Sequence, residues 1–275
     1  MKIDLKIKHG FTLAEVFSVH PKDGRKQAFT LAEVLITLGI IGVVAAMTLP
    51  TLIQKHQKKV TVTQLKKAYT ELAQAIQLAE VQFGELATWH TPKSAFNNDI
   101  LENNKNFAEN YLFPSIKTVN RCIPSSDECW SDDIVNLNGV SLYNTNYLSN
   151  SIGNRVSFVT VSGYSVFFWL NANGGGMWYW VDLNGPKKGP NKIGRDIFVF
   201  SGSWSTSNSR GVFPYGLDRP TRPTRESLIN GSFEKVNYKC KFEPDETVLD
   251  MVGAYCGALI VLDGWKIADD YPWKN

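Results

Sequence analysis

The sequence predicts an α+β protein in which one long N-terminal helix precedes a head built on an antiparallel sheet. Two observations lead to this class. An apolar run from Phe29 to Ile53 continues without a break into a segment whose apolar residues recur every three or four positions. Beyond residue 85, short runs rich in β-branched and aromatic residues alternate with Gly and Asn. A helix followed by consecutive strands is typical of α+β proteins.

The net positive charge of the chain comes from its first 28 residues. The 275 residues contain 29 Lys and Arg against 26 Asp and Glu, which gives a net charge of +3. Residues 1–28 carry this entire excess, and residues 29–275 are neutral overall. Because a neutral remainder offers no positive field to a polyanion, we expect no nucleic-acid binding.

The same six letters, "FTLAEV", occur twice near the N-terminus, after Gly10 and after Ala28. The apolar run behind the first copy ends within two residues, so this copy does not open a membrane span. Behind the second copy, residues 29–53 form a stretch of 25 residues with one charge, Glu33. A helix of this length crosses a hydrocarbon core about 30 Å thick. We therefore expect the second copy to be the working signal and residues 1–28 to be a cleaved cytoplasmic leader.

A carboxylate inside a membrane helix is costly, so Glu33 requires a partner or a function. The stretch "AFTLAEVLITLGIIGVVAAMTLPTLI" closely resembles the N-terminal processing and methylation segment of type IV pilins and of type II secretion pseudopilins. The shared features are a basic leader, a small residue, a Phe, a glutamate at the fifth position after the cut and an uninterrupted apolar run. The chain departs from the usual pattern at Ala28, where most members of the family have glycine.

This resemblance implies how the chain is processed. A prepilin peptidase/methyltransferase would cut between Ala28 and Phe29 on the cytoplasmic side and methylate the new amine. Glu33 would then pair with the amino group of a neighbouring subunit during assembly. Opposite charges attract strongly in a medium of low dielectric, which agrees with this role.

The resemblance also implies partners and a location. The protein would be a structural subunit and not an enzyme, and it would join other pilin or pseudopilin subunits in a filament built on an inner-membrane assembly platform. The filament would serve type II secretion or a related pilus machine. Before assembly, membrane lipid would hold the chain as a single-pass protein of the inner membrane, with a cytoplasmic N-terminus and an extracytoplasmic head.

Three alternatives remain open from the residues. A plain secretory signal peptide fits the small residues near Ala46. An ordinary signal anchor fits the apolar run alone, and a membrane-anchored extracytoplasmic domain could bind glycan or protein without polymerising. Lys55, Lys58 and Lys59 follow the span on its far side and weaken the charge asymmetry that sets orientation.

The helix is expected to continue beyond the membrane to Phe83. Its apolar residues lie three and four apart: Val62, Leu65, Tyr69, Leu72, Ile76, Ala79 and Phe83. Gly84 is a suitable C-terminal stop, and Pro50 removes a backbone donor and is expected to kink the helix. The predicted layout is therefore a leader at 1–28, a helix at 29–83 with its transmembrane segment at about 30–53, and a head at 84–275.

The head is predicted to contain a second helix and at least four strands. The helix covers "NNKNFAENYLF" and ends at Pro114, and the strands are "RVSFVTV", "YSVFFWL", "MWYWVDL" and "DIFVFSG". The segment "NANGGG" is expected to join the middle two strands as an antiparallel hairpin. The region from Tyr238 onward is expected to form a return strand and an aromatic tail.

Four cysteines form two local pairs, Cys122 with Cys129 and Cys240 with Cys256. Outside the cytoplasm, disulfides are the expected state, although four cysteines permit three connectivities and proximity merely favours the local one. A structural zinc site is the alternative, but the sequence has no C-x-x-C and no histidine close to any of the four.

One loop carries residues suited to a metal, and no other cofactor is expected. Asp182, Asn184, Asn191 and Asp196 supply hard oxygen ligands on a Gly-rich loop between two strands, which suits calcium. Some major pseudopilins bind calcium in a loop beside their last strands, so the resemblance supports this reading. The alternative is a turn in which these side chains hydrogen-bond to their own backbone.

Six aromatic residues lie close together on two of the predicted strands. The cluster contains Phe167, Phe168, Trp169, Trp178, Tyr179 and Trp180. It is expected to form a buried hairpin, with an exposed sugar- or protein-binding face as the alternative.

The sequence contains no G-x-S-x-G, no H-E-x-x-H and no P-loop.

Overall fold

The computed structural model describes residues 29–86, 89, 100–142, 154–171, 176–203, 211–217, 222–231, 238–243 and 251–273. Residue contacts divide the chain into two compact units, Met1–Leu52 and Ile53–Asn275, and each is described by itself below. The predicted leader, the first signal copy and Ala28 lie outside the described residues.

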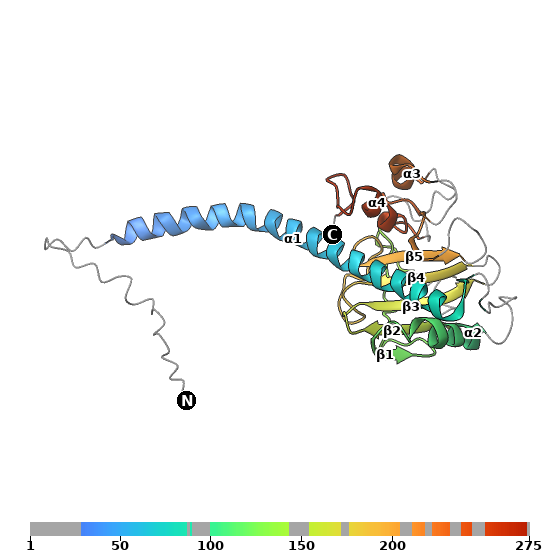
Figure 1. Cartoon of the computed structure of the whole chain (residues 1–275). Helices are drawn as coiled ribbons and strands as arrows, with labels where there is room; N and C mark the ends of the chain where they lie inside the picture. Colours follow the sequence, from blue (N-terminus) through green and yellow to red (C-terminus); the bar gives the residue numbers. More distant parts are fainter. Residues whose placement is uncertain are drawn as a thin grey trace, which may run out of the picture. The chain divides into compact units, whose positions relative to one another are not determined.

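The longest element is helix α1 (Leu31–Phe83), which contains 53 residues (Figure 1). Among the described residues it is the one helix long and apolar enough to cross a membrane, with a mean hydropathy of 2.2 over its most apolar 18-residue window. None of that window is buried inside the protein, whereas the core helix of a soluble protein would be mostly buried. Pro50 lies inside α1, which continues past it, and the kink expected there stays a prediction.

In the second unit, α1 buries one stripe of its surface. The buried residues of this stripe are Leu65, Ala68, Leu72, Ala75, Ile76 and Ala79. Leu65, Leu72, Ile76 and Ala79 belong to the predicted stripe, whereas Ala68 and Ala75 lie on the same face and were not predicted. Val62 and Tyr69, at the margins of the stripe, are partly buried, and Phe83 keeps 43% of its surface exposed.

A six-stranded antiparallel sheet forms the centre of the second unit, and its strand order follows the sequence, β1-β2-β3-β4-β5-β6. The strands are β1 (Thr118–Cys122), β2 (Val156–Thr160), β3 (Ser165–Asn171), β4 (Gly176–Asp182), β5 (Ile197–Ser203) and β6 (Phe213–Pro214). The four predicted strands correspond to β2, β3, β4 and β5. The α+β class is therefore confirmed, and β1 and β6 are additions at the two edges.

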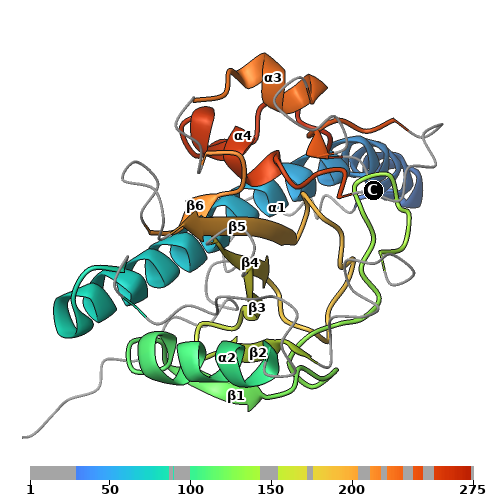
Figure 2. The same cartoon turned by 90° about the vertical axis from the view of Figure 1, so that its right-hand side faces the viewer.

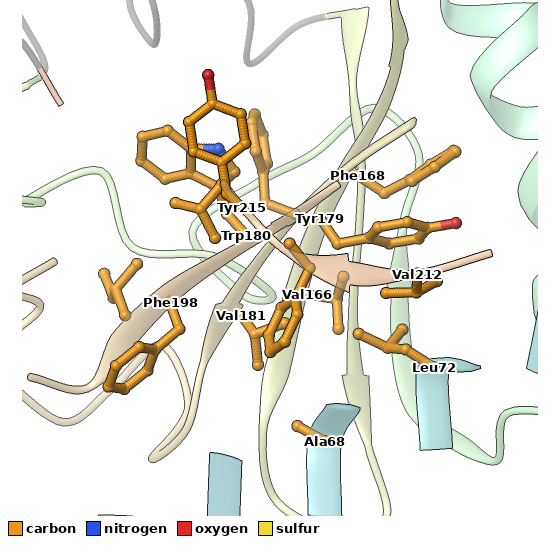
Figure 3. Close-up of a cluster of buried hydrophobic side chains, with 14 of the residues drawn as sticks. Ala68, Leu72, Val166, Phe168, Tyr179, Trp180, Val181, Phe198, Val212 and Tyr215 are labelled. Carbon is orange, nitrogen blue, oxygen red and sulfur yellow. The ribbon is translucent and has the colours of Figure 1, made fainter. Parts of the chain in front are cut away.

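One face of the sheet packs against helices α1 and α2 (Ile100–Phe107). The strand register places Phe168, Tyr179 and Phe200 side by side on this face. Phe200 stacks on Tyr69 of α1 at 5.9 Å between ring centroids, and Phe168 stacks on Phe107 of α2 at 5.3 Å. Figure 3 shows Phe168 and Tyr179 of this face together with Ala68 and Leu72 of α1.

The opposite face of the sheet is also covered. Phe167 stacks on Trp130 with ring centroids 5.4 Å apart, and Trp178 lies 4.6 Å from the ring of Tyr215. Because both faces of the central strands are packed, their sequences are nearly continuous apolar runs and do not alternate with polar residues.

Shorter helical elements also occur in the described part of the second unit. Helix α2 continues as a π-helical turn, η3 (Ala108–Leu112), so the second helix predicted to end at Pro114 is confirmed. Helix α3 (Arg225–Asn230) starts at Thr224, whose hydroxyl accepts the Ser227 N–H at 3.2 Å, and ends at Gly231 with φ of 73°.

The predicted return strand after Tyr238 is wrong, because residues 256–262 form helix α4 (Cys256–Leu262). A short apolar run such as "GALIVL" does not by itself separate a strand from a buried helix. The turn after the helix is typical of a helix C-terminus. Gly264 has φ of 72°, and the Trp265 N–H donates to the Ile260 carbonyl at 2.8 Å. Figure 2 shows α3 and α4 together near β5 and β6.

Candidate functional site

The N-terminal site is built around Glu33 in the first turn of α1. Its Oε2 accepts hydrogen bonds from the Thr30 backbone N–H at 2.8 Å and from the Thr30 hydroxyl at 2.9 Å. The Thr30 hydroxyl in turn accepts the Glu33 backbone N–H at 3.2 Å. This reciprocal pair is a capping box, which starts the helix one residue after Thr30.

The capping box leaves one carboxylate oxygen unused. Among the described residues, Oε1 of Glu33 accepts no hydrogen bond, while Oε2 is held by Thr30. Phe29, next to Thr30, is 84% exposed, so the backbone on which a new N-terminus would form is accessible. The role of Thr30 was missed from the sequence, although the pattern Thr-x-x-Glu before an apolar run is the signature of a capping box.

Two stretches of the chain match known families. Residues 23–49 match the prokaryotic N-terminal methylation motif, which includes the second signal copy and leaves out the first. Residues 51–275 match the Family of unknown function (DUF6613). The chain belongs to this family. No curated protein and no solved structure matches the chain.

The methylation motif shows that this family member is a type IV pilin-like, prepilin-type protein. The resemblance noted from the sequence is thus confirmed, and the chain is of the pilin and pseudopilin type that prepilin peptidase processes. The unburied apolar half of α1 agrees with a pilin-like protein anchored in a membrane.

Both predicted disulfides are present in the head. Cys122 at the end of β1 is bonded to Cys129 with 6.1 Å between Cα atoms, and Cys240 is bonded to Cys256 at the start of α4 with 4.8 Å. No cysteine of the chain is free, so the alternative of a zinc site on these cysteines is wrong.

The four residues predicted to bind calcium lie together in the loop between β4 and β5. Asp182 ends β4, and Asp196 directly precedes β5. The Asn184 Nδ2 group donates to Asp196 Oδ2 at 3.3 Å, and the Asn191 backbone N–H donates to the same oxygen at 2.9 Å. The two aspartates are buried, at 1% and 6% exposed, whereas Asn184 and Asn191 are half-buried.

Backbone donors satisfy part of this cluster. Asp182 Oδ1 accepts the N–H groups of Asn184 at 3.1 Å and Gly185 at 3.2 Å. Asp196 Oδ1 accepts the Lys192 N–H at 2.7 Å. These are the contacts that the turn interpretation predicted.

Three buried oxygens of the cluster have no hydrogen-bond partner among the described residues, namely Asp182 Oδ2, Asn184 Oδ1 and Asn191 Oδ1. A buried oxygen that stays without a partner costs about 1–3 kcal/mol of stability. Carboxylate and amide oxygens are the ligands that Ca²⁺ prefers, so the residues present fit a hard cation. No group of three or more His, Cys, Asp or Glu suited to a metal occurs in the described part of the chain, so such a site would depend on its amide oxygens.

The pKa shifts of the two aspartates also suit a bound cation. Burial, as the main cause, and the nearby Asp196 carboxylate raise the pKa of Asp182 to about 7, although the backbone donors of Asn184 and Gly185 lower it. Burial also raises the pKa of Asp196. A bound cation would favour both ionised carboxylates and relieve this repulsion.

The predicted aromatic cluster is mostly core. Phe167, Phe168, Tyr179 and Trp180 are buried, which confirms the buried hairpin for these four. Trp169 and Trp178 are half-buried and stack at 5.7 Å with an interplanar angle of 3°. The Arg155 guanidinium lies 5.1 Å from the Trp169 ring centre, so this pair already has a cationic neighbour.

Proposed function

We propose that this pilin-like protein is a structural subunit, cut between Ala28 and Phe29 and assembled through α1 into a filament for type II secretion or a related pilus machine. The observation that supports the proposal most directly is the apolar half of α1. Its side chains are unburied, and it carries one carboxylate in its first turn. Lipid covers such a surface before assembly, and the corresponding helices of other subunits cover it in a filament.

The capping box suits Glu33 to pairing with a second subunit. Thr30 fixes Oε2, while Oε1 is available for the methylated amine of a neighbouring Phe29. Pairing therefore requires no loss of the intrahelical hydrogen bonds. An unpaired carboxylate in hydrocarbon is costly, so the membrane itself favours the paired state.

Processing is tested by the intact mass and N-terminal sequence of the membrane-extracted protein. We expect a mature chain that begins with methylated Phe29. The duplicated signal provides a matched control, since Ala28→Arg should block cleavage and Gly10→Arg should leave it unchanged. Retention of the whole leader, or a start just after Ala46, would contradict the proposal.

Assembly is tested by the same use of the two copies. Glu33→Ala should abolish incorporation into sheared filaments, whereas Glu15→Ala in the discarded copy should not. A membrane-anchored glycan- or protein-binding domain that never polymerises is the alternative function. It would give no filament-associated protein even for the parent chain, and no difference between the two variants.

The remaining partners and the location follow from this role. The chain would meet prepilin peptidase/methyltransferase on the cytoplasmic side, then the inner-membrane assembly platform and other subunits. Its head would lie outside the cytoplasm, where both disulfides are stable. Its contribution would be mechanical and not catalytic.

We further propose that the loop between β4 and β5 binds Ca²⁺ through Asp182, Asn184, Asn191 and Asp196. Binding to the folded state alone would stabilise the head by about 2.7 kcal/mol at a hundredfold excess over Kd. Thermal unfolding of the mature protein should shift upward with CaCl₂. Asp182→Asn should lose the shift, and the exposed control Asp132→Asn should keep it. If the parent and both variants respond equally to CaCl₂, the four side chains do not bind Ca²⁺ and the turn interpretation holds.

A further inference from the structure

An open groove of about 720 Å³ lies in the second unit, between the first turns of α1 in that unit and the segment after α4. Five lysines line it: Lys55, Lys58, Lys59, Lys66 and Lys266. One carboxylate, Asp269, also lines it, so the groove carries a net charge of +4. This concentration is notable in a chain that is neutral overall after residue 28.

The lysines of this groove lack ion-pair partners among the described residues. Among the described residues, none of the five lysines forms an ion pair with a carboxylate, whereas the neighbouring Lys67 lies 3.9 Å from Glu71. Four of the five are exposed, and Lys58 is half-buried. Five lysines that share one groove with a single carboxylate repel one another, so an anionic ligand would bind here favourably.

One wall of the groove is apolar and is formed by the segment that follows α4. Gly264 and Trp265 both have positive φ, at 72° and 61°, and this turn brings the Trp265 ring to 5.7 Å from Tyr69 of α1. The Lys66 ammonium lies 5.7 Å from the Trp265 ring centre. Val62 and Ile267 extend the apolar lining. The groove thus combines ammonium groups with an aromatic and aliphatic surface.

The position of these lysines in the sequence indicates which anion they meet. Lys55, Lys58 and Lys59 follow Ile53, the last residue of the predicted span, by two to six residues. At 1.5 Å per residue this is within about 10 Å of the hydrocarbon boundary, the depth of the lipid headgroups. The orientation of the span does not account for lysines on its far side, which are disfavoured there. Anionic headgroups at this depth would attract them.

We propose that this groove binds the headgroup phosphates of anionic phospholipids in the outer leaflet of the membrane that anchors the protein. The ammonium groups contact the phosphates, and Trp265 packs against the glycerol and upper acyl region, as aromatic residues do at membrane interfaces. Bound lipid would hold the base of the head against the bilayer until the subunit is extracted. The inference rests on the proposed function, since it requires an extracytoplasmic head.

The test uses the full mature chain in detergent and measures retained lipid by native mass spectrometry. The parent should retain phosphatidylglycerol in preference to phosphatidylcholine, and the preference should fall as salt rises. The triple variant Lys58→Gln, Lys59→Gln, Lys66→Gln should weaken phosphatidylglycerol retention roughly 100-fold, from the effect of three lysines near a surface. The same positions changed to Arg should retain it.

A matched triple variant removes three positive charges elsewhere in the second unit, through Lys67→Gln, Lys117→Gln and Lys188→Gln. It should retain phosphatidylglycerol as the parent does, because none of these residues lines the groove. Equal retention of both lipids by the parent, or equal losses in the two Gln triples, would overturn the inference. So would tighter binding of a soluble polyanion, such as an oligonucleotide, than of phosphatidylglycerol.

The two proposals are separated by the accessibility of the head to protease in spheroplasts. If the head is cleaved from outside and no lipid preference is found, the groove inference fails alone. If the head is protected, the proposed orientation fails, and the groove inference fails with it.

Discussion

At the scale of single residues, Glu71 links α1 to the turn between β2 and β3. Its Oε1 accepts the Ser162 hydroxyl and its Oε2 accepts the Tyr164 hydroxyl, each at 2.8 Å. Both carboxylate oxygens therefore have a donor in this turn. The partners are 91 and 93 residues away in sequence, so no local pattern could reveal this contact.

Replacing the tyrosine in this contact tests its contribution and its pH dependence. Tyr164→Phe should lower the free energy of unfolding by about 1–2 kcal/mol, because Glu71 loses a charge-assisted hydrogen bond. Burial, followed by the bond to Glu71, raises the pKa of Tyr164 well above its ordinary value. Tyrosine in the unfolded chain ionises near pH 10.

The sign of the pH effect follows from that pKa. Above about pH 10 the unfolded chain releases this proton and the folded chain keeps it, so stability falls as pH rises. Urea unfolding of the mature protein in detergent, followed from pH 7 to above pH 10, should show a shallower alkaline decline for Tyr164→Phe. Tyr111→Phe is the control, because it removes a tyrosine hydroxyl from a residue that makes ring contacts with Phe83 and Trp89. Parallel declines for the parent and Tyr164→Phe would contradict the assignment.

At the scale of elements, α4 is fixed from two sides. The disulfide between Cys240 and Cys256 holds its first residue, and Gly194 in the loop before β5 approaches the same disulfide. A Cβ at Gly194 would lie 2.9 Å from Cys256 Sγ, closer than such atoms normally approach. Gly194 also has φ of +82°, so both conformation and packing require glycine there.

Alanine substitutions separate these two requirements. Gly194→Ala should destabilise the head by about 2–4 kcal/mol, from backbone strain and from displacement of the disulfide. Gly139→Ala, at φ of +87° with no atom within 4 Å of the added Cβ, should cost about 1–2 kcal/mol from strain alone. Thermal unfolding of the two variants should therefore rank Gly194→Ala lower, and equal midpoints would contradict the packing argument.

The elements that the sequence predicted are those with a strong local signal. The central strands were predicted because they are long apolar runs between Gly and Asn breaks. Strand β1 was missed because its sequence, "TVNRC", is polar and lies at an edge. Helix α3 carried an unused signal, with Thr224 as its N-cap and Gly231 after its end.

The candidate sites also differ in how far the sequence could predict them. The cluster around Asp182 and Asp196 was predictable, since one short loop between adjacent strands carries all four side chains. The basic groove was not, because Trp265, in the turn after α4, meets Lys66 and Tyr69 of α1 only in the tertiary structure. Glu33 was identified by its charge in an apolar run, and its partner Thr30 was overlooked although it lies three residues away.

At the scale of the whole molecule, three boundaries nearly coincide. The family match begins at residue 51, the compact second unit begins at Ile53, and the apolar run ends at the same Ile53. The second unit contains the buried core of the described residues and both disulfides. We therefore expect this unit to fold without the membrane half of α1.

A fragment of residues 53–275, exported to an oxidising compartment, tests this independence. It should be water-soluble, unfold cooperatively and contain no free thiol, because its core and disulfides need nothing from residues 1–52. The matched control is the same fragment with Cys240→Ala and Cys256→Ala, which should lose about 2–5 kcal/mol of stability because the loop that anchors α4 is no longer closed. Aggregation of the parent fragment, or gradual unfolding without a transition, would show that the head depends on the apolar half of α1 and would place the folding boundary before Ile53.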